Sequence, residues 1–149
     1  MRTRTPVYSE QTQVQPSDTD DLTMVNLSSP PAGTLLVPEG TMSTALAPGQ
    51  VGFVARVFTV RKLLRITGKI ALPLPEKPLN ALFFRNDTGV GTFNRVVSLQ
   101  TQLQSDGSFK AEITTESYAN LIPGFFVVAL RNPKANRIVV ILELTVTSE

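Results

Sequence analysis

Residues 96–113, VVSLQTQLQSDGSFKAEI, alternate apolar and polar side chains on both sides of the tripeptide Ser105-Asp106-Gly107. Successive side chains of a β-strand point to opposite faces, so this period of two is typical of strands with one face in a core and the other in water. Ser-Asp-Gly is a combination that favours a tight turn. The segment therefore predicts a β-hairpin. Its predicted polar face carries Gln100, Gln102 and Gln104.

The same period recurs earlier in the chain. The stretches VGFVARVFTV, residues 51–60, and KLLRITGKIALPL, residues 62–74, predict two neighbouring strands, and LNALFFR, residues 79–85, predicts another. Gly68 indicates a bulge or a close approach of the backbone. Because proline lacks the amide hydrogen that a sheet needs, the prolines of residues 73–78 are expected to end the ladder. The predicted core face of the second strand consists of Leu64, Ile66, Ile70 and Leu72.

The C-terminal third has a different pattern. FFVVAL, residues 125–130, and IVVIL, residues 138–142, are apolar at every position and flank a turn at residues 132–136. A strand that is apolar on both faces is expected to be covered on both. The cover is expected to be an N-terminal arm, a second layer of strands or another subunit. The candidate contact residues are Phe125, Val127, Ile138 and Val140.

These patterns predict an all-β fold, either an antiparallel β-sandwich or a jelly-roll-like barrel. The chain has 149 residues, 42% of them hydrophobic, which suits one compact core. The predicted β-sandwich domain covers residues 49–149, and residues 114–122 form at most one helical turn. The apolar runs are much shorter than the roughly 20 residues of a membrane-spanning helix, so no membrane association is expected.

Residues 1–48 form an extended polar arm in this interpretation. The arm holds two arginines and five acidic residues, a net charge of −3, whereas residues 49–149 hold twelve basic and seven acidic residues, a net charge of +5. Such a polar segment cannot bury enough apolar surface to order itself, so it is either a disordered tail or an arm held by a neighbour. Two short extended pieces are predicted, Thr34 to Val37 and Met42 to Leu46. Because phosphate binding needs clustered cations, direct nucleic-acid binding is not expected.

Composition also restricts the chemistry. The chain contains no Cys, His or Trp, which removes the commonest nucleophile, general base and zinc ligands. Residues 17–21, SDTDD, could bind a cation or be a solvated acidic turn, and residues 86–91 are interpreted as a turn rather than a phosphate cradle. An enzyme would need carboxylates such as Glu112 and Glu143 brought together in a pocket. We therefore expect no enzymatic activity, metal or cofactor. With no signal-like segment at Met1, synthesis in the cytoplasm is expected.

Cations cluster only between residues 56 and 69. They are interpreted as a site for an anionic partner, as a solvated outer face, or as partners of the acidic arm. The glutamine row could hydrogen-bond a sugar, a neighbouring chain or water. The basic group consists of Arg56, Arg61, Lys62, Arg65 and Lys69.

Residues 51–74, VGFVARVFTVRKLLRITGKIALPL, resemble the small β-sandwich modules of bacteriophage virions, both head-decorating proteins and fibre-tip domains. The resemblance covers about a sixth of the chain and implies copies arranged as a trimer or another ring on a shell or tail. We therefore expect a non-enzymatic virion structural protein, a capsid-decorating or other head or tail component, that uses its N-terminal arm to bind neighbouring subunits. Its expected partners are copies of itself and a major capsid or tail protein. The alternative is a receptor- or glycan-binding tip module, which the scarcity of aromatic residues disfavours.

Overall fold

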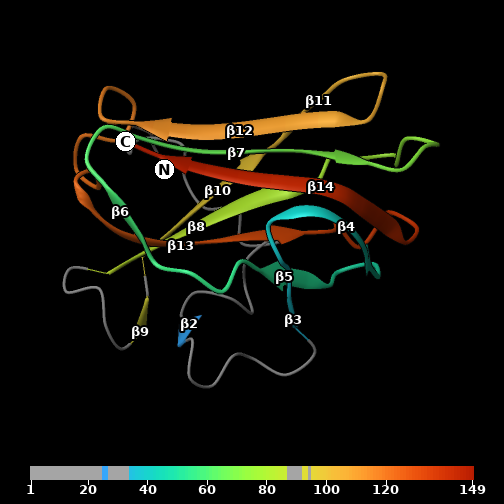
Figure 1. Ribbon diagram of the computed structural model, residues 1–149, viewed down its shortest axis with the longest axis horizontal. Helices are drawn as coiled ribbons and strands as arrows, with labels where there is room; N and C mark the ends of the chain where they lie inside the picture. The colour runs from blue at the N-terminus through green and yellow to red at the C-terminus, as the bar shows by residue number, and fades with distance from the viewer. Residues whose placement is uncertain (1–24, 27–33, 87–91, 94) are drawn as a thin grey trace.

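The fold is an all-β sandwich, as predicted, and it is not closed into a barrel. The computed structural model describes residues 25–26, 34–86, 92–93 and 95–149. Two sheets pack face to face, with β12, β7 and β14 in one layer and β8, β13 and β5 in the other (Figure 1). The six-stranded sheet contains β3 (Leu35–Leu36), β5 (Val51–Phe53), β6 (Phe58–Val60), β8 (Asn80–Asn86), β10 (Arg95–Gln100) and β13 (Gly124–Arg131). The five-stranded sheet contains β4 (Gly40–Leu46), β7 (Leu63–Ile70), β11 (Gln102–Leu103), β12 (Ser108–Thr114) and β14 (Val139–Ser148).

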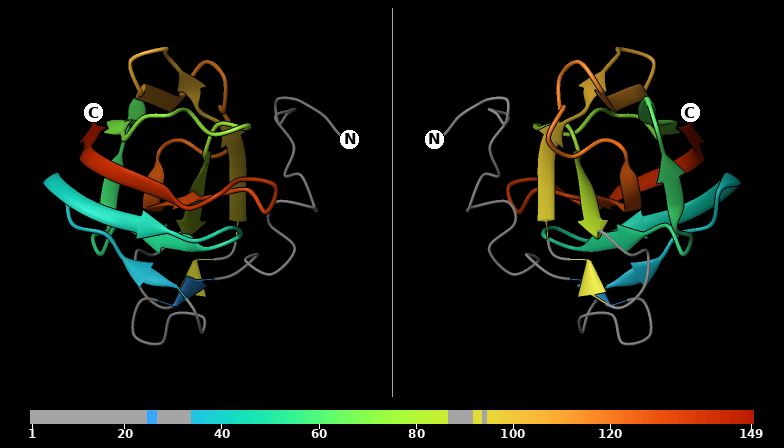
Figure 2. Two further views of the ribbon diagram at one scale, coloured as in Figure 1. Left: turned by 90° about the vertical axis from the view of Figure 1, so that its right-hand side faces the viewer. Right: turned by 90° about the vertical axis from the view of Figure 1, so that its left-hand side faces the viewer.

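The chain changes sheet at most of its connections. The order within the six-stranded sheet is β10-β8-β13-β5-β3, with β6 also beside β13, and the order within the other is β11-β12-β7-β14-β4. A small separate ladder joins β2 (Val25–Asn26) to β9 (Thr92–Phe93). Figure 2 shows the two layers from their ends, with the core between them. Strands that follow one another in the sequence therefore mostly lie in different sheets and face each other across the core.

The predicted pairing of residues 51–60 with 62–74 is wrong for this reason. β5 and β6 pair with β13, whereas β7 lies in the other sheet between β12 and β14. The corner between β6 and β7 is held by the carbonyl of Glu149, which accepts hydrogen bonds from the amides of Arg61 and Leu63 at 2.8 and 3.1 Å. The predicted core face of β7 is confirmed at Leu64, Ile66 and Ile70 and fails at Leu72, which lies beyond the strand and is 59% exposed.

The predicted hairpin at residues 96–113 is correct only near its turn. Gln102 and Leu103 of β11 pair with β12, but β10 pairs with β8 in the other sheet. The change of sheet occurs at the buried Thr101, whose backbone amide and hydroxyl both donate to the carbonyl of Leu79, at 2.9 and 2.8 Å. This pair of hydrogen bonds replaces the ladder where the strand breaks, so a polar residue can be buried there.

The C-terminal pair of apolar strands is not a hairpin either, because β13 and β14 belong to different sheets. Strand β13 is buried on both faces, as predicted. Phe126, Val128 and Leu130 face the main core between the sheets. Val127 and Ala129 belong to a second cluster on the other face of the six-stranded sheet, the face on which β2 and β9 lie (Figure 1). The second cluster also contains Val51, Phe53, Leu82 and Phe84.

Strand β14 behaves differently. Its buried residues alternate with half-buried or exposed ones, and Ile138, just before the strand, is 62% exposed. The prediction of burial on both faces is therefore wrong for residues 138–142. Because β13 is buried within the single chain, its apolar composition does not by itself require another subunit.

Part of the predicted arm belongs to the sandwich. Strands β3 and β4 confirm the two extended pieces and form one edge of each sheet, and Val37 between them is buried. Glu39 of the same connection forms an ion pair with Arg56, with 3.5 Å between Oε2 and Nε. The predicted acidic turn at residues 17–21 lies outside the described residues.

Gly68 and Gly107 both lie where the backbone of another segment comes close. A Cβ at Gly68 would collide with the carbonyl of Glu143 and the ring of Phe109, which confirms the predicted close approach in β7. Gly107 in the turn before β12 has a φ of 93°, and its carbonyl accepts a hydrogen bond from the amide of Ile70 at 2.9 Å. Residues other than glycine rarely adopt that conformation. The glycine at position 107 therefore indicated the place of the turn in the sequence.

Candidate functional site

A pocket of about 540 Å³ lies at one end of the sandwich, between the loop after β7 and the loop before β14. Both loops project beyond the same end of the sheets, at the right of Figure 1. The pocket is lined by residues 71–76 and 135–140. We call it the end pocket.

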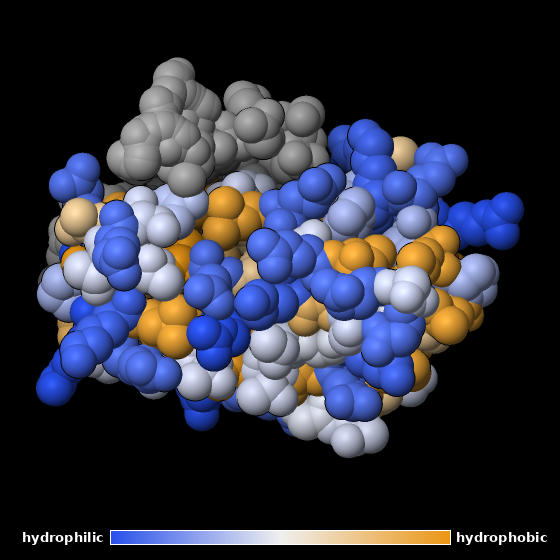
Figure 3. Space-filling model, turned by 90° about the horizontal axis from the view of Figure 1, so that it is seen from above, coloured by the Kyte–Doolittle hydropathy of each residue, from blue (hydrophilic) through white to orange (hydrophobic). Residues whose placement is uncertain are grey.

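Exposed apolar side chains gather around the end pocket. Leu72, Leu74 and Ile138 line it and are 59%, 42% and 62% exposed. They are three of the five large apolar residues that are exposed in the described part of the chain. Apolar surface also shows among the polar side chains toward the right-hand end in Figure 3, which views the five-stranded sheet from outside. Clustering of this kind marks a binding surface more often than scattered exposure does.

Two buried asparagines hold the loops around the end pocket together. The Asn132 amide nitrogen donates to the carbonyls of Leu46 and Arg137, at 2.9 and 2.8 Å. The Asn136 amide nitrogen donates to the Asn132 side-chain oxygen at 2.9 Å and to the carbonyl of Lys77 at 2.8 Å. The Lys77 amide in turn donates to the Asn136 side-chain oxygen at 2.9 Å.

This network connects three segments that are distant in the sequence: the end of β4, the loop after β7 and the loop after β13. Asn132 is 0% exposed and Asn136 is 5% exposed, so their amide groups are satisfied within the protein. A satisfied buried network fixes the relative positions of the groups that it joins. The network therefore fixes the loop after β7 and the loop before β14, which form the walls of the end pocket, relative to each other.

The predicted basic group does not form one patch. Arg56 lies between β5 and β6, where its guanidinium stacks on Phe58 with 4.1 Å from Cζ to the ring centroid. Arg61 and Lys62 lie at the exposed corner before β7. Arg65 and Lys69 lie on the outer face of β7. The ion pair of Arg56 with Glu39 agrees with the interpretation that acidic residues of the first 48 pair with these cations.

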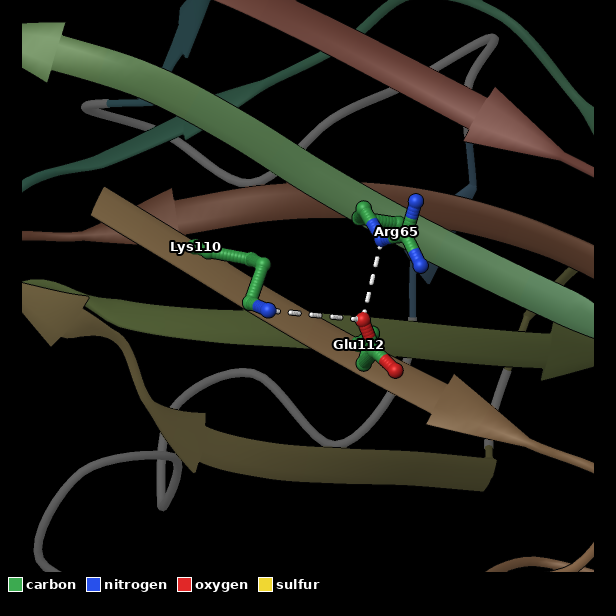
Figure 4. Close-up of polar contacts among 3 residues, drawn as sticks. All are labelled: Arg65, Lys110 and Glu112. Atoms are coloured by element: carbon green, nitrogen blue, oxygen red, sulfur yellow. Dashed lines mark hydrogen bonds and ion pairs between the residues drawn. The ribbon is translucent and has the colours of Figure 1, made fainter. Parts of the chain in front are cut away.

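The outer face of the five-stranded sheet carries a small charge cluster, shown in Figure 4. Arg65 Nε donates to Glu112 Oε1 at 2.9 Å, and Lys110 Nζ lies 4.0 Å from the same oxygen. Nearby, the Ser108 hydroxyl and amide donate to Asp106 Oδ1 at 2.6 and 2.9 Å. The hydroxyl and then the amide of Ser108 lower the pKa of Asp106 from its ordinary value of 3.8, whereas desolvation acts in the opposite direction. These contacts stabilise a solvated face.

The remaining predicted contact residues are dispersed. Gln100, Gln102 and Gln104 are all exposed, but Gln100 belongs to the six-stranded sheet and Gln102 to the other. Phe125 is half-buried beside the second cluster, and Val127 is fully buried in it. Of the predicted set, only Ile138 and Val140 line the end pocket.

Sequence reasoning missed Leu72 and Leu74. The available signal was their position among prolines in ALPLPEKP, residues 71–78, because a segment that cannot join a sheet cannot bury alternate residues in its core. Asn132 and Asn136 were interpreted only as turn residues.

Neither Glu112 nor Glu143 lines the end pocket. Glu112 pairs with Arg65, whereas Glu143 is exposed on β14, opposite Lys69 in the ladder. No group of three His, Cys, Asp or Glu residues suited to a metal ion occurs in the described ranges. Within the same residues, no helix has the length and apolar character to cross a membrane.

Comparison with protein-family models, with curated proteins and with solved structures finds no match to the chain.

Proposed function

We propose that this chain is a non-enzymatic structural protein of a virion, a capsid-decorating or other head or tail component, that binds a neighbouring protein subunit through the end pocket. The observation that carries the proposal is the gathering of Leu72, Leu74 and Ile138 around a pocket whose walls are already fixed. The virion setting is supported by the resemblance of residues 51–74 to phage β-sandwich modules.

The apolar area suits a protein partner. Fully burying a large aliphatic side chain contributes about 2 kcal/mol, and these three side chains are roughly half exposed, so covering them contributes about 3 kcal/mol. That is about two orders of magnitude in affinity. Glu76 and Arg137 also line the pocket and supply polar groups of both signs for orientation.

The test uses particles of the virus that encodes the chain. The wild-type chain should copurify with them in a fixed ratio to a major capsid or tail protein. The double variant Leu72→Ser/Ile138→Ser should fold, as judged by circular dichroism, and be lost from the particles. Val57→Ser, which removes an exposed apolar side chain outside the pocket, is the control and should be retained. Absence of the wild-type chain from particles would contradict the virion role, and equal retention of the double variant would contradict the role of the pocket.

A glycan-binding tip module is the second candidate function, favoured by one observation. Gln102, Lys110, Thr67 and Thr145 lie side by side in one row across β11, β12, β7 and β14. Such a row presents amide, ammonium and hydroxyl groups to solvent. Binding to a glycan array that Gln102→Ala and Lys110→Ala abolish, with no effect of the pocket variant, would favour this function.

A further inference from the structure

Strand β4 is a long sheet edge without the usual protection. It is the last strand in the order of the five-stranded sheet, and among the residues that the structure describes it pairs with β14 alone. Its sequence, GTMSTAL, spans seven residues and contains neither a charged residue nor proline. Edge strands expose unpaired backbone donors and acceptors, and proteins usually block them with lysine, proline or very short length. Of the other edge strands, β11 and β3 have two residues each, and the six-residue β10 begins with the charged Arg95.

The same side of the sandwich also exposes an apolar residue. Leu36 of β3 is 59% exposed, and only residues 37–39 separate β3 from β4. Figure 2 shows both strands, in cyan, along one side of the molecule. Thr41, Ser43 and Ala45 of β4 are exposed as well. A partner strand would thus meet open backbone groups beside an exposed leucine.

We propose that β4 pairs with β4 of a second copy, antiparallel about a two-fold axis, so that the two five-stranded sheets join into one continuous sheet. A two-fold axis perpendicular to a strand makes the two copies antiparallel, and such a strand can pair with itself if it brings no like charges together. The uncharged β4 meets that condition. Leu36 of each copy adds apolar contact at the rim of the interface.

Ser43 is the middle residue of β4 and would lie opposite its own copy. Ala45 would lie diagonally from Ser43 of the other copy, within reach of a long side chain. Both residues are exposed, so charged replacements are compatible with the fold. The end pocket is not used, and the pairing is therefore independent of the proposed function.

The experiment measures the mass of the full chain by sedimentation equilibrium over a range of concentrations. The wild-type chain should dimerise. The variants Ser43→Lys/Ala45→Lys and Ser43→Glu/Ala45→Glu should each dimerise on the order of tenfold more weakly, because like charges oppose each other across the axis. An equimolar mixture of the two variants should dimerise again. Thr145→Lys/Thr147→Lys adds the same charge to exposed positions of β14 and should leave dimerisation unchanged.

Three results would overturn the proposal. The first is a wild-type chain that stays monomeric at every concentration, which would leave the edge for a different protein. The second is dimerisation that the β4 variants do not weaken. The third is a mixture of the two variants that stays monomeric, because antiparallel pairing of β4 with itself requires that opposite charges restore it.

Discussion

Replacing Asn132 with alanine tests whether the asparagine network holds the end pocket together. The replacement removes three side-chain hydrogen bonds of 2.8 to 2.9 Å, two donated to the carbonyls of Leu46 and Arg137 and one accepted from Asn136. Asn132 is 0% exposed, so water does not readily replace these partners. At about 1 kcal/mol for each hydrogen bond, with a further contribution from the buried groups left unpaired, Asn132→Ala should lower the free energy of unfolding by about 4 kcal/mol.

A loss of this size should lower the melting temperature by about 10 °C in a chain of this length. Urea unfolding followed by circular dichroism measures the free energy, and differential scanning calorimetry measures the temperature. Asn120→Ala is the matched control, because Asn120 is exposed and its replacement should change stability by less than about 0.5 kcal/mol. A loss below about 1 kcal/mol for Asn132→Ala would refute the claim that the network ties the end of β4 to the loops after β7 and β13.

Three further predictions address other parts of the sandwich. Gly68→Ala should destabilise the fold by about 1 to 3 kcal/mol, because the new Cβ collides with backbone and the Phe109 ring; an unchanged melting temperature would contradict this. Asp106 has a lowered pKa in the folded state, so its stabilising effect is present above pH 3.8 and is lost as the pH falls through the lowered pKa. The stability difference between wild type and Asp106→Ala should therefore shrink in acid, and a difference that grows would contradict the reasoning. A double-mutant cycle on Arg65 and Glu112, whose side chains are 37% and 33% exposed, should give a coupling of about 0.5 kcal/mol that falls with added salt; a salt-independent value would contradict a screened pair.

The strands were readable from the sequence, because each local pattern depends on which side chains face a core. The alternation of β7 and β12 and the continuous apolar run of β13 are all present in the structure. The turn at Gly107 was readable for the same local reason, since few residues adopt its conformation.

The assignment of strands to sheets could not be read in this way. Period-two alternation is the same whether the next strand lies beside a strand or across the core from it. Thr101 shows the difficulty, because it is a polar residue at an apolar position of the alternation, between Leu99 and Leu103, and is the buried point at which the chain changes sheet. The hydrogen bonds that decide this point join Thr101 to Leu79, a residue that no local pattern connects with it.

The end pocket illustrates the same limit. Ile138 and Val140 were predicted as contact residues on the assumption of a two-sided apolar strand. They line the pocket for a different reason, because the loop before β14 and the first residues of β14 lie beside the loop after β7. Leu72 and Leu74 come from a loop more than 60 residues earlier, held there by the contacts of Lys77 with Asn136. A site built from two distant loops leaves no periodic signature in either.

The interior position of β14 has a consequence for biosynthesis. Strand β14 pairs with β7 on one side and β4 on the other, although both precede it by more than 65 residues. A nascent chain that has emerged only as far as β13 therefore leaves one edge of β7 and one edge of β4 without the strand that pairs with them in the complete sheet. Pairing between strands that are distant in the sequence slows folding. Synthesis of β14 is thus the step that permits this sheet to be completed, and before that step the edges of β7 and β4 are open to pairing with other chains.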